Sequence, residues 1–196
     1  MKRPTAEMLI SAYSQGIFPM AHEDADWDVF WYAPDPRTII EFDEFHVPKR
    51  LGRTVRQGKF EVRFSTAFEQ VMRECAQPRP HDGIWISEGL IEAYCELHEL
   101  GFAHSVECWQ DDELVGGLYG VALRGLFAGE SMFHKVTDAS KVALVHLVER
   151  LQEKGFVLLD TQFTTAHLAK FGAKEIPRAE YERRVSMAMN VDAHFI

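Results

Sequence analysis

The stretch GGLYGVALRGLFAGESMF, residues 116–133, decides how we interpret this chain of 196 residues. It is apolar and rich in glycine, and it carries one acid, Glu130, near its end. A second apolar run, LLDTQ (158–162), ends on Asp160 and Gln162. A buried acid is costly unless it is hydrogen-bonded or functional. The two runs therefore predict strands whose polar ends converge on an apolar pocket, the default place for an active site.

Composition narrows the class of protein. A net charge of −9 argues against nucleic-acid binding over the whole surface, although it leaves room for a local basic patch and would suit a basic partner. No apolar run approaches the ~20 residues of a membrane span, and the N-terminus lacks a secretion signal, so we expect no membrane association. Three widely spaced cysteines predict a reducing cytoplasm, with neither a disulfide nor a metal site.

The order of strand and helix patterns predicts a mixed sheet with helices on its faces, an α/β (α+β) fold. Residues 1–60 are expected to form a small N-terminal lobe and residues 61–196 the main domain. Prolines and acids predict irregular structure over 18–37. The expected helices are 5–15, 87–100, 138–154, 164–171 and 178–189, with short ones after Pro48 and after Ser65 or Thr66. The expected strands are 38–42, 60–64, 103–110, 113–122, 124–131 and 156–160.

Asp160 and Gln162 stand at positions i and i+2, which places both side chains on one face of an extended segment. An ionised Asp accepts hydrogen bonds and Gln both donates and accepts them. Asp160 can therefore hold the Gln162 amide so that its oxygen faces an attacking amine. The alternative is an ordinary strand-end aspartate that caps the next helix through Thr164. Glu130 either binds a substrate ammonium group or pairs with an internal arginine or a backbone amide.

Basic and aromatic residues indicate a second set of candidates. Lys49, Arg50 and Arg53 belong to the only basic run, which can hold phosphates despite the negative net charge or can be a solvated helix face. Trp85 follows the expected turn at 81–83 and can stack on a nucleobase. Tyr94 lies on an amphipathic helix, where core packing is the alternative role. Further candidates are Tyr13 and Trp31 for stacking, and His104 and His167 as bases.

Five stretches, taken in order, resemble the leucyl/phenylalanyl-tRNA–protein transferases of bacteria from about Leu9 to Tyr181. They are AYSQGIFPM (12–20), WYAPDPR (31–37), GIWISEGLIEAYCELHELGFAHSVE (83–107), DELVGGLYGVALRGLFAGESMF (112–133) and LLDTQFTTAHLAKFGAKEIPR (158–178). The resemblance implies a main domain similar to the acetyltransferase (GNAT) fold. It implies transfer of Leu or Phe, and less well Met, from charged tRNA to the N-terminal Lys or Arg of a protein, which marks that protein for degradation. An aminoacyl ester is already activated, so no cofactor or metal is required.

The resemblance also implies roles for individual residues. Asp160 of the D-x-Q motif polarises Gln162, which directs the amine, and Glu130 helps to hold the aminoacyl ester end. The implied aminoacyl pocket comprises Leu118, Phe127, Gly129, Ser131, Met132, Leu144, Leu151 and Leu159. The implied contacts with the terminal adenosine of tRNA are Trp85, Tyr94 and Tyr13, and those with the acceptor stem are Lys49, Arg50 and Arg53.

The chain departs from the family pattern at two positions. Met20 replaces the tryptophan that usually follows Phe-Pro, and Thr165 replaces the asparagine that usually follows D-x-Q. These changes keep two alternatives open: a homologue with altered amino-acid or acceptor choice, and a non-catalytic binder of basic N-termini. We expect a monomer that works in the cytoplasm.

Overall fold

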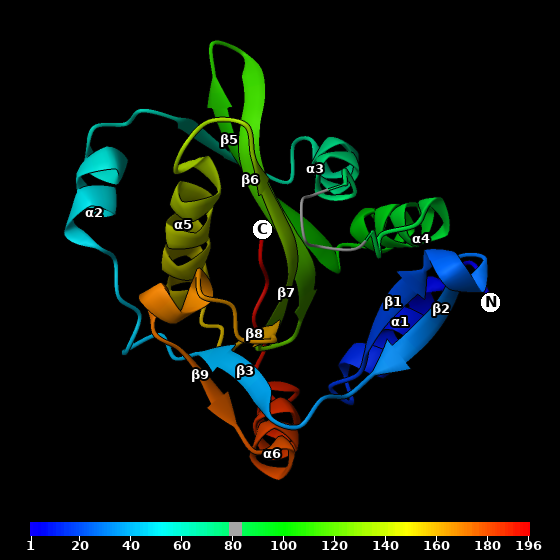
Figure 1. The fold of residues 1–196 in the computed structure, drawn as a ribbon. Coiled ribbons are helices and arrows are strands. Elements are labelled where there is room, and N and C mark those ends of the chain that lie inside the picture. Colours follow the sequence, from blue (N-terminus) through cyan, green and yellow to red (C-terminus); the bar gives the residue numbers. More distant parts are fainter. Residues whose placement is uncertain (79–83) are drawn as a thin grey trace.

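The computed structural model describes residues 1–78 and 84–196, and the turn expected at residues 81–83 lies outside them. Within the described chain a seven-stranded sheet, ordered β4-β5-β6-β7-β8-β3-β9, forms the centre of the molecule (Figure 1). Its strands are β3 (Arg37–Ile40), β4 (Glu61–Phe64), β5 (Ala103–Gln110), β6 (Glu113–Leu123), β7 (Leu126–His134), β8 (Leu158–Gln162) and β9 (Ala173–Ile176). Neighbouring strands are antiparallel except β7 and β8, which run parallel. This mixed sheet confirms the expected fold class.

The longest hairpin follows from local sequence. β5 and β6 pair from Gln110↔Glu113 onward, around a two-residue turn in which Asp111 and Asp112 have φ values of 51° and 61°. Aspartate tolerates this left-handed conformation, and two-residue hairpin turns of this type require it at both positions. The hairpin expected around these two residues is confirmed.

Helices cover both faces of the sheet (Figure 1). On one face α5 (Ala139–Glu153) packs on β5, β6 and β7, with α2 (Lys49–Arg56) beside it. On the other face α1 (Ala6–Tyr13), α3 (Phe68–Cys75) and α4 (Glu88–Glu99) share a core with β6. α6 (Arg178–Ala188) packs against Leu158 and Ile39 near the last strands. The helices expected over 5–15, 87–100, 138–154 and 178–189 and after Pro48 are confirmed.

The expectation of irregular structure over residues 18–37 was wrong. β1 (Phe18–His22) and β2 (Asp28–Tyr32) form a two-stranded antiparallel sheet, joined by a short 3₁₀ turn, η1 (Glu23–Ala25). Pro19 pairs with Trp31 in this hairpin. A proline is tolerated there because both strands are edge strands, where a missing N–H leaves no ladder bond unmade. The hairpin packs on the same core as α4.

Two further local expectations were wrong. The N-cap of α3 is Ala67 rather than Ser65 or Thr66, because Glu107 of β5 accepts bonds from the main-chain nitrogens of Thr66 (2.9 Å) and Ala67 (3.0 Å) and from the Thr66 hydroxyl. The helix expected over 164–171 is only the 3₁₀ turn η2 (Leu168–Phe171), and β9, which follows it, was not expected.

The position of β3 bears on the domain boundary. β3 lies between β8 and β9 in the main sheet, so part of the expected lobe of residues 1–60 is built into the main domain. We propose that the small lobe ends before Arg37, since α1, β1 and β2 all precede that residue. Among the helices of the described residues, none combines the length and apolar character that crossing a bilayer demands.

Candidate active site

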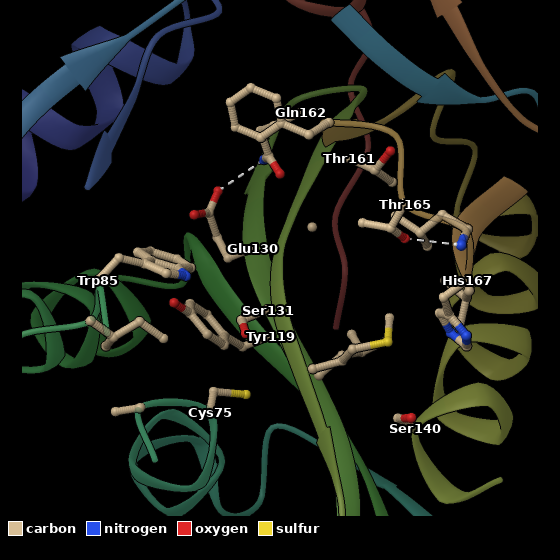
Figure 2. Close-up of a pocket in the computed structure, with 18 of the residues that line it drawn as sticks. Cys75, Trp85, Tyr119, Glu130, Ser131, Ser140, Thr161, Gln162, Thr165 and His167 are labelled. Carbon is tan, nitrogen blue, oxygen red and sulfur yellow. Dashed lines mark hydrogen bonds between the residues drawn. The ribbon is translucent and has the colours of Figure 1, made fainter. Parts of the chain in front are cut away.

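A cavity of about 910 Å³ opens where β7 and β8 part. The two strands pair from Leu126↔Leu158 to Ala128↔Asp160, and the pairing stops there. Beyond this point the side chains of Glu130 and Gln162 project into the cavity from the two strands (Figure 2). The topology therefore brings the ends of the two apolar runs together, as the sequence predicts.

Most of the apolar residues that line the cavity belong to two separate hydrophobic cores, and we call the two sets the apolar arm and the aromatic arm of the cavity. The apolar arm lies between the sheet and α5, and its walls are Leu118, Met132, Leu144, Leu147, Leu159 and Leu168. The aromatic arm lies beside the small lobe and α3, and its walls are Phe18, Met20, Ala21, His22, Cys75, Ala76, Ile84, Trp85 and Ile86. Figure 2 shows Glu130 between Trp85 on one side and Thr165 and His167 on the other. The arrangement can hold a bipartite ligand whose junction lies beside the polar pair.

A β-bulge aims Glu130 into the cavity. Tyr119 pairs with Ser131 and Gly120 pairs with Gly129, so Glu130 is the extra residue on β7. A bulge bends its strand and reorients a side chain, and such irregularities gather beside active sites. Gly120 permits the close approach, because a Cβ at this position would lie 2.3 Å from the carbonyl oxygen of Ala128.

A second irregularity separates Asp160 from Gln162. Thr38 pairs with Gln162 and Ile39 with Asp160, so Thr161 is an extra residue on β8. Gln162 has a φ of 57°, an uncommon conformation for a residue with a side chain. The expectation that Asp160 and Gln162 share one face was therefore wrong. Gln162 lines the cavity, whereas Asp160 is fully buried and outside the set of lining residues.

Asp160 is saturated by hydrogen bonds away from the cavity. Its two carboxylate oxygens accept hydrogen bonds from Arg37 Nε at 2.8 Å and from Arg37 Nη2 at 2.6 Å. They also accept the Tyr181 hydroxyl at 2.8 Å and the main-chain N–H of Gln162 at 2.9 Å. Arg37 and Asp160 are both buried, and the guanidinium lies over the rings of Phe18 and Tyr181. Asp160 therefore holds the main chain of Gln162 and not its side-chain amide.

Glu130, rather than Asp160, holds the side-chain amide of Gln162. Gln162 Nε2 donates to Glu130 Oε1 at 3.2 Å, and the Tyr94 hydroxyl donates to Glu130 Oε2 at 3.5 Å. Tyr13 in turn bonds to Tyr94. Burial raises the pKa of Glu130 to about 8, with the charge of Asp160 adding to the effect and the tyrosine hydroxyls opposing it. With Nε2 engaged, the amide oxygen of Gln162 is left to accept a bond from a ligand.

The predicted aminoacyl pocket divides between cavity and core. Six of its eight residues line the cavity: Leu118, Gly129, Ser131, Met132, Leu144 and Leu159. Phe127 and Leu151 are fully buried in the core that α5 shares with the sheet, so the inclusion of these two in the wall was wrong. Alternation along β7 turns Phe127 toward Phe156 and Phe195 instead.

The aromatic candidates also divide. Trp85 lines the cavity and stays partly exposed. Tyr13 and Tyr94 are 1% and 0% exposed, so neither ring offers a face to a nucleobase, and the expected stacking on them does not fit this structure. Their hydroxyls serve the Glu130 carboxylate instead. Met20, which replaces the usual tryptophan, lies in the same arm as Trp85.

The basic candidates lie outside the cavity but are connected to it. Lys49, Arg50 and Arg53 are exposed on α2. Arg50 Nη2 donates to Asp138 Oδ2 at 3.1 Å, and Lys141 Nζ donates to Asp138 Oδ1 at 2.6 Å. Both Asp138 and Lys141 line the cavity, so the basic helix reaches its rim.

The two histidines differ. His104 is buried outside the cavity, where it bonds to the Ser65 hydroxyl (3.0 Å) and the Gly101 carbonyl (3.1 Å), and burial lowers its pKa to about 4. That environment is structural. His167 lines the cavity, and its Nε2 atom is buried without a hydrogen-bond partner among the described residues. Burial lowers the pKa of His167 as well.

Sequence reasoning missed Arg37, Tyr181 and Leu147. Arg37 ends the quoted WYAPDPR stretch and Tyr181 follows the last one, but nothing local signals that they meet at Asp160. Leu147 stands three residues after Leu144 on α5, and that helical spacing is a signal that could have found it.

Comparisons with known proteins identify the family of the chain. The family model for "Leucyl/phenylalanyl-tRNA protein transferase" matches residues 39–186, and the model for the N-terminal domain of the same family matches residues 3–35. The chain is similar to the leucyl/phenylalanyl-tRNA–protein transferase of Herpetosiphon aurantiacus, with 58% identity over 99% of each chain. It is also similar to that of Gloeobacter violaceus, with 54% identity over 97% of each chain.

Solved structures of other proteins share the fold, one of them from Agrobacterium fabrum. The C-terminal domain of a putative lysylphosphatidylglycerol synthetase from Agrobacterium fabrum matches with a TM-score of 0.50 and 10% identity, over all of this chain and 73% of the other. The matched family model and relatives place the chain in the class of acyl-transferring enzymes. The chain belongs to the leucyl/phenylalanyl-tRNA–protein transferase family.

Proposed function

We propose that this protein moves Leu or Phe, and less well Met, from the 3′ end of charged tRNA to the N-terminal Lys or Arg of an acceptor protein. The product would carry a bulky apolar N-terminus that marks it for degradation. One observation carries the proposal: the hydrogen-bonded side chains of Gln162 and Glu130 stand at the junction of an apolar arm and an aromatic arm of one cavity. Membership of the transferase family supports it.

The apolar arm suits the aminoacyl side chain. Leu118, Met132, Leu144 and Leu159 offer hydrocarbon walls, and Leu147 extends them. A branched or aromatic apolar side chain gains about 1.5–3 kcal/mol by leaving water for such a wall. A charged side chain would lose its hydration without a partner and is rejected.

The polar pair suits attack by an amine on the ester. A protein α-amine has a pKa of ~7.7–8.0, so an appreciable fraction is neutral at pH 7. The Gln162 oxygen accepts an N–H of that amine and directs the nitrogen lone pair at the ester carbonyl carbon. The amide bond forms, the carbon–oxygen bond to the ribose breaks, and the ribose oxygen takes up a proton. Because burial raises the pKa of Glu130 to about 8, close to that of the amine, Glu130 can exchange this proton at little cost.

Asp160 is a positioning residue in this scheme. Its carboxylate ties the main chain of Gln162 to Arg37 and Tyr181, and thereby maintains the left-handed conformation at Gln162. Holding two reacting groups in place accounts for much of the rate of transfers that start from an activated ester.

The remaining contacts concern the tRNA. Trp85 would stack on the terminal adenine, a contact worth ~1–3 kcal/mol per base. Lys49, Arg50 and Arg53 on α2 would contact phosphates of the acceptor stem. Met20 and Thr165, the two departures from the family pattern, both line the cavity, so they bear on the nucleoside that it accepts.

We further propose that the enzyme acts as a monomer in the cytoplasm. The described residues of one chain supply both arms and the polar pair, so the site needs no second copy. Cys95 and Cys108 are free thiols, which suits a reducing compartment.

The test is transfer of labelled Phe from charged tRNA to a peptide that begins with Arg. Wild-type protein should label this peptide and a Lys-initiated peptide, but not the same peptide beginning with Glu. Gln162→Ala should lower kcat about 100-fold or more, the scale of a positioned polar group in catalysis, with little change in the KM for tRNA. A wild-type protein that labels no peptide from Leu-, Phe- or Met-tRNA would refute the proposal.

A further inference from the structure

One ring nitrogen of His167 is a buried polar atom without a hydrogen-bond partner among the described residues. His167 Nε2 is buried in the cavity wall and has no hydrogen-bond partner within residues 1–78 and 84–196. Buried polar atoms in folded proteins nearly always have one, and an exception at a cavity points to an absent ligand. Figure 2 shows His167 on the α5 side of the cavity, across from Trp85.

The surroundings of His167 are cationic. Lys141 and His134 also line the cavity, and the positive charges of Lys141 and Lys170 act on the imidazole. The acid that faces them is Asp138, which is already engaged by Lys141 and by Arg50. A ligand that satisfies this corner must therefore accept hydrogen bonds and carry negative charge.

The basic character continues onto α2. Arg50 connects Asp138 to the helix that also carries Lys49 and Arg53, and these two cations have no ion-pair partner among the described residues. The opposite rim differs in sign, because Glu23 and Asp24 follow His22 of the cavity wall and are exposed. A polyanion would consequently leave the cavity over His167 and Lys141 toward α2, and not over the small lobe.

We propose that His167 and Lys141, with His134 at the edge, form a binding site for a backbone phosphate of the single-stranded 3′ end of tRNA. The site would lie between the aromatic arm, which holds Trp85, and the acceptor-stem contacts on α2. It rests on the proposed function, and it deepens it by giving the path of the nucleic acid. Phosphate contacts fix register and orientation without reading sequence, so the site would serve any charged tRNA.

The test compares two donors that share the ester and differ in phosphates: Phe-tRNA and 3′-O-phenylalanyl-adenosine, which has none. His167→Asn and Lys141→Gln should each raise the KM for Phe-tRNA about tenfold, the effect of removing one charge-assisted hydrogen bond. The KM for phenylalanyl-adenosine should stay within about twofold. The slope of log KM against log salt should fall by about 0.7 for each phosphate that the variant no longer binds.

Arg183→Gln is the matched control, because Arg183 is an exposed cation on α6 that does not line the cavity; it should leave both KM values unchanged. Equal KM increases for the two donors would overturn the proposal and make His167 part of the aminoacyl pocket. Unchanged KM values for Phe-tRNA in folded variants would overturn it too. A wild-type protein inactive with both donors would instead refute the proposed function itself.

Discussion

Replacing Asp160 should lower the stability of the fold, and it should reduce transfer mainly through that loss of stability. Asp160→Ala leaves the Arg37 guanidinium buried at 1% exposure, with its carboxylate partner removed. Losing one member of a buried pair costs about 3–5 kcal/mol, because the remaining charge stays out of water. For a chain of this size, about 2–4 °C of melting temperature accompany each kcal/mol, so the melting temperature should fall by roughly 6–20 °C.

Urea unfolding followed by tryptophan fluorescence measures this cost. Asp192→Ala is the matched control, because its partner Arg124 is 58% exposed and surface pairs contribute about 0–1 kcal/mol. Transfer by Asp160→Ala should recover partly at low temperature, where the variant is folded. A variant with wild-type stability and no transfer would refute this reasoning and return Asp160 to a direct role in catalysis.

Three further predictions concern the walls of the cavity. The pKa of Glu130 is raised to about 8 from an ordinary value near 4.3, so the folded state binds the extra proton between these values. The free energy of unfolding of the wild type should therefore decline by up to about 1.4 kcal/mol per pH unit from about pH 5 to 8, relative to that of Glu130→Gln. Urea unfolding at each pH measures both values. The same pH dependence in the two proteins would contradict the burial argument. Gly120→Ala should unfold more readily and lower kcat, since its Cβ would meet the Ala128 carbonyl at 2.3 Å, whereas Gly129→Ala, 3.6 Å from its nearest neighbour, should remain folded. Leu147→Trp should raise the KM for Phe-tRNA more than that for Leu-tRNA by filling the apolar arm; equal changes would place the aminoacyl group elsewhere.

Local patterns were enough to predict most of the elements. Three-residue apolar spacing predicts α5, and alternation around Asp111-Asp112 predicts the β5–β6 hairpin, because both depend on neighbours in sequence. The β1–β2 hairpin escaped prediction because Pro19 and the acids after it are typical of loops, whereas the hairpin packs on α1 and on the core that α1 shares with α3 and α4. Tertiary contacts override such local signals.

The site was predictable in its members but not in its connections. Glu130 and Gln162 were expected to converge, and they do. The partner of the Gln162 side chain could not be deduced, because two bulges turn Glu130 into the cavity and Asp160 away from it. A bulge depends on register between strands. Arg37 and Asp160 are 123 positions apart in sequence, so only the fold reveals their pairing.

We expect the carbonyl of the esterified amino acid to lie beside Gln162 and Glu130, with the amino-acid side chain in the apolar arm. A crystal structure with an amide-linked phenylalanyl-adenosine analogue measures this directly. We predict the phenyl ring among Leu118, Met132 and Leu144, the adenine on Trp85, and the amide carbonyl carbon within about 4 Å of the Gln162 amide, the reach of a near-attack arrangement. An analogue bound with its carbonyl away from the gap between β7 and β8 would contradict the account.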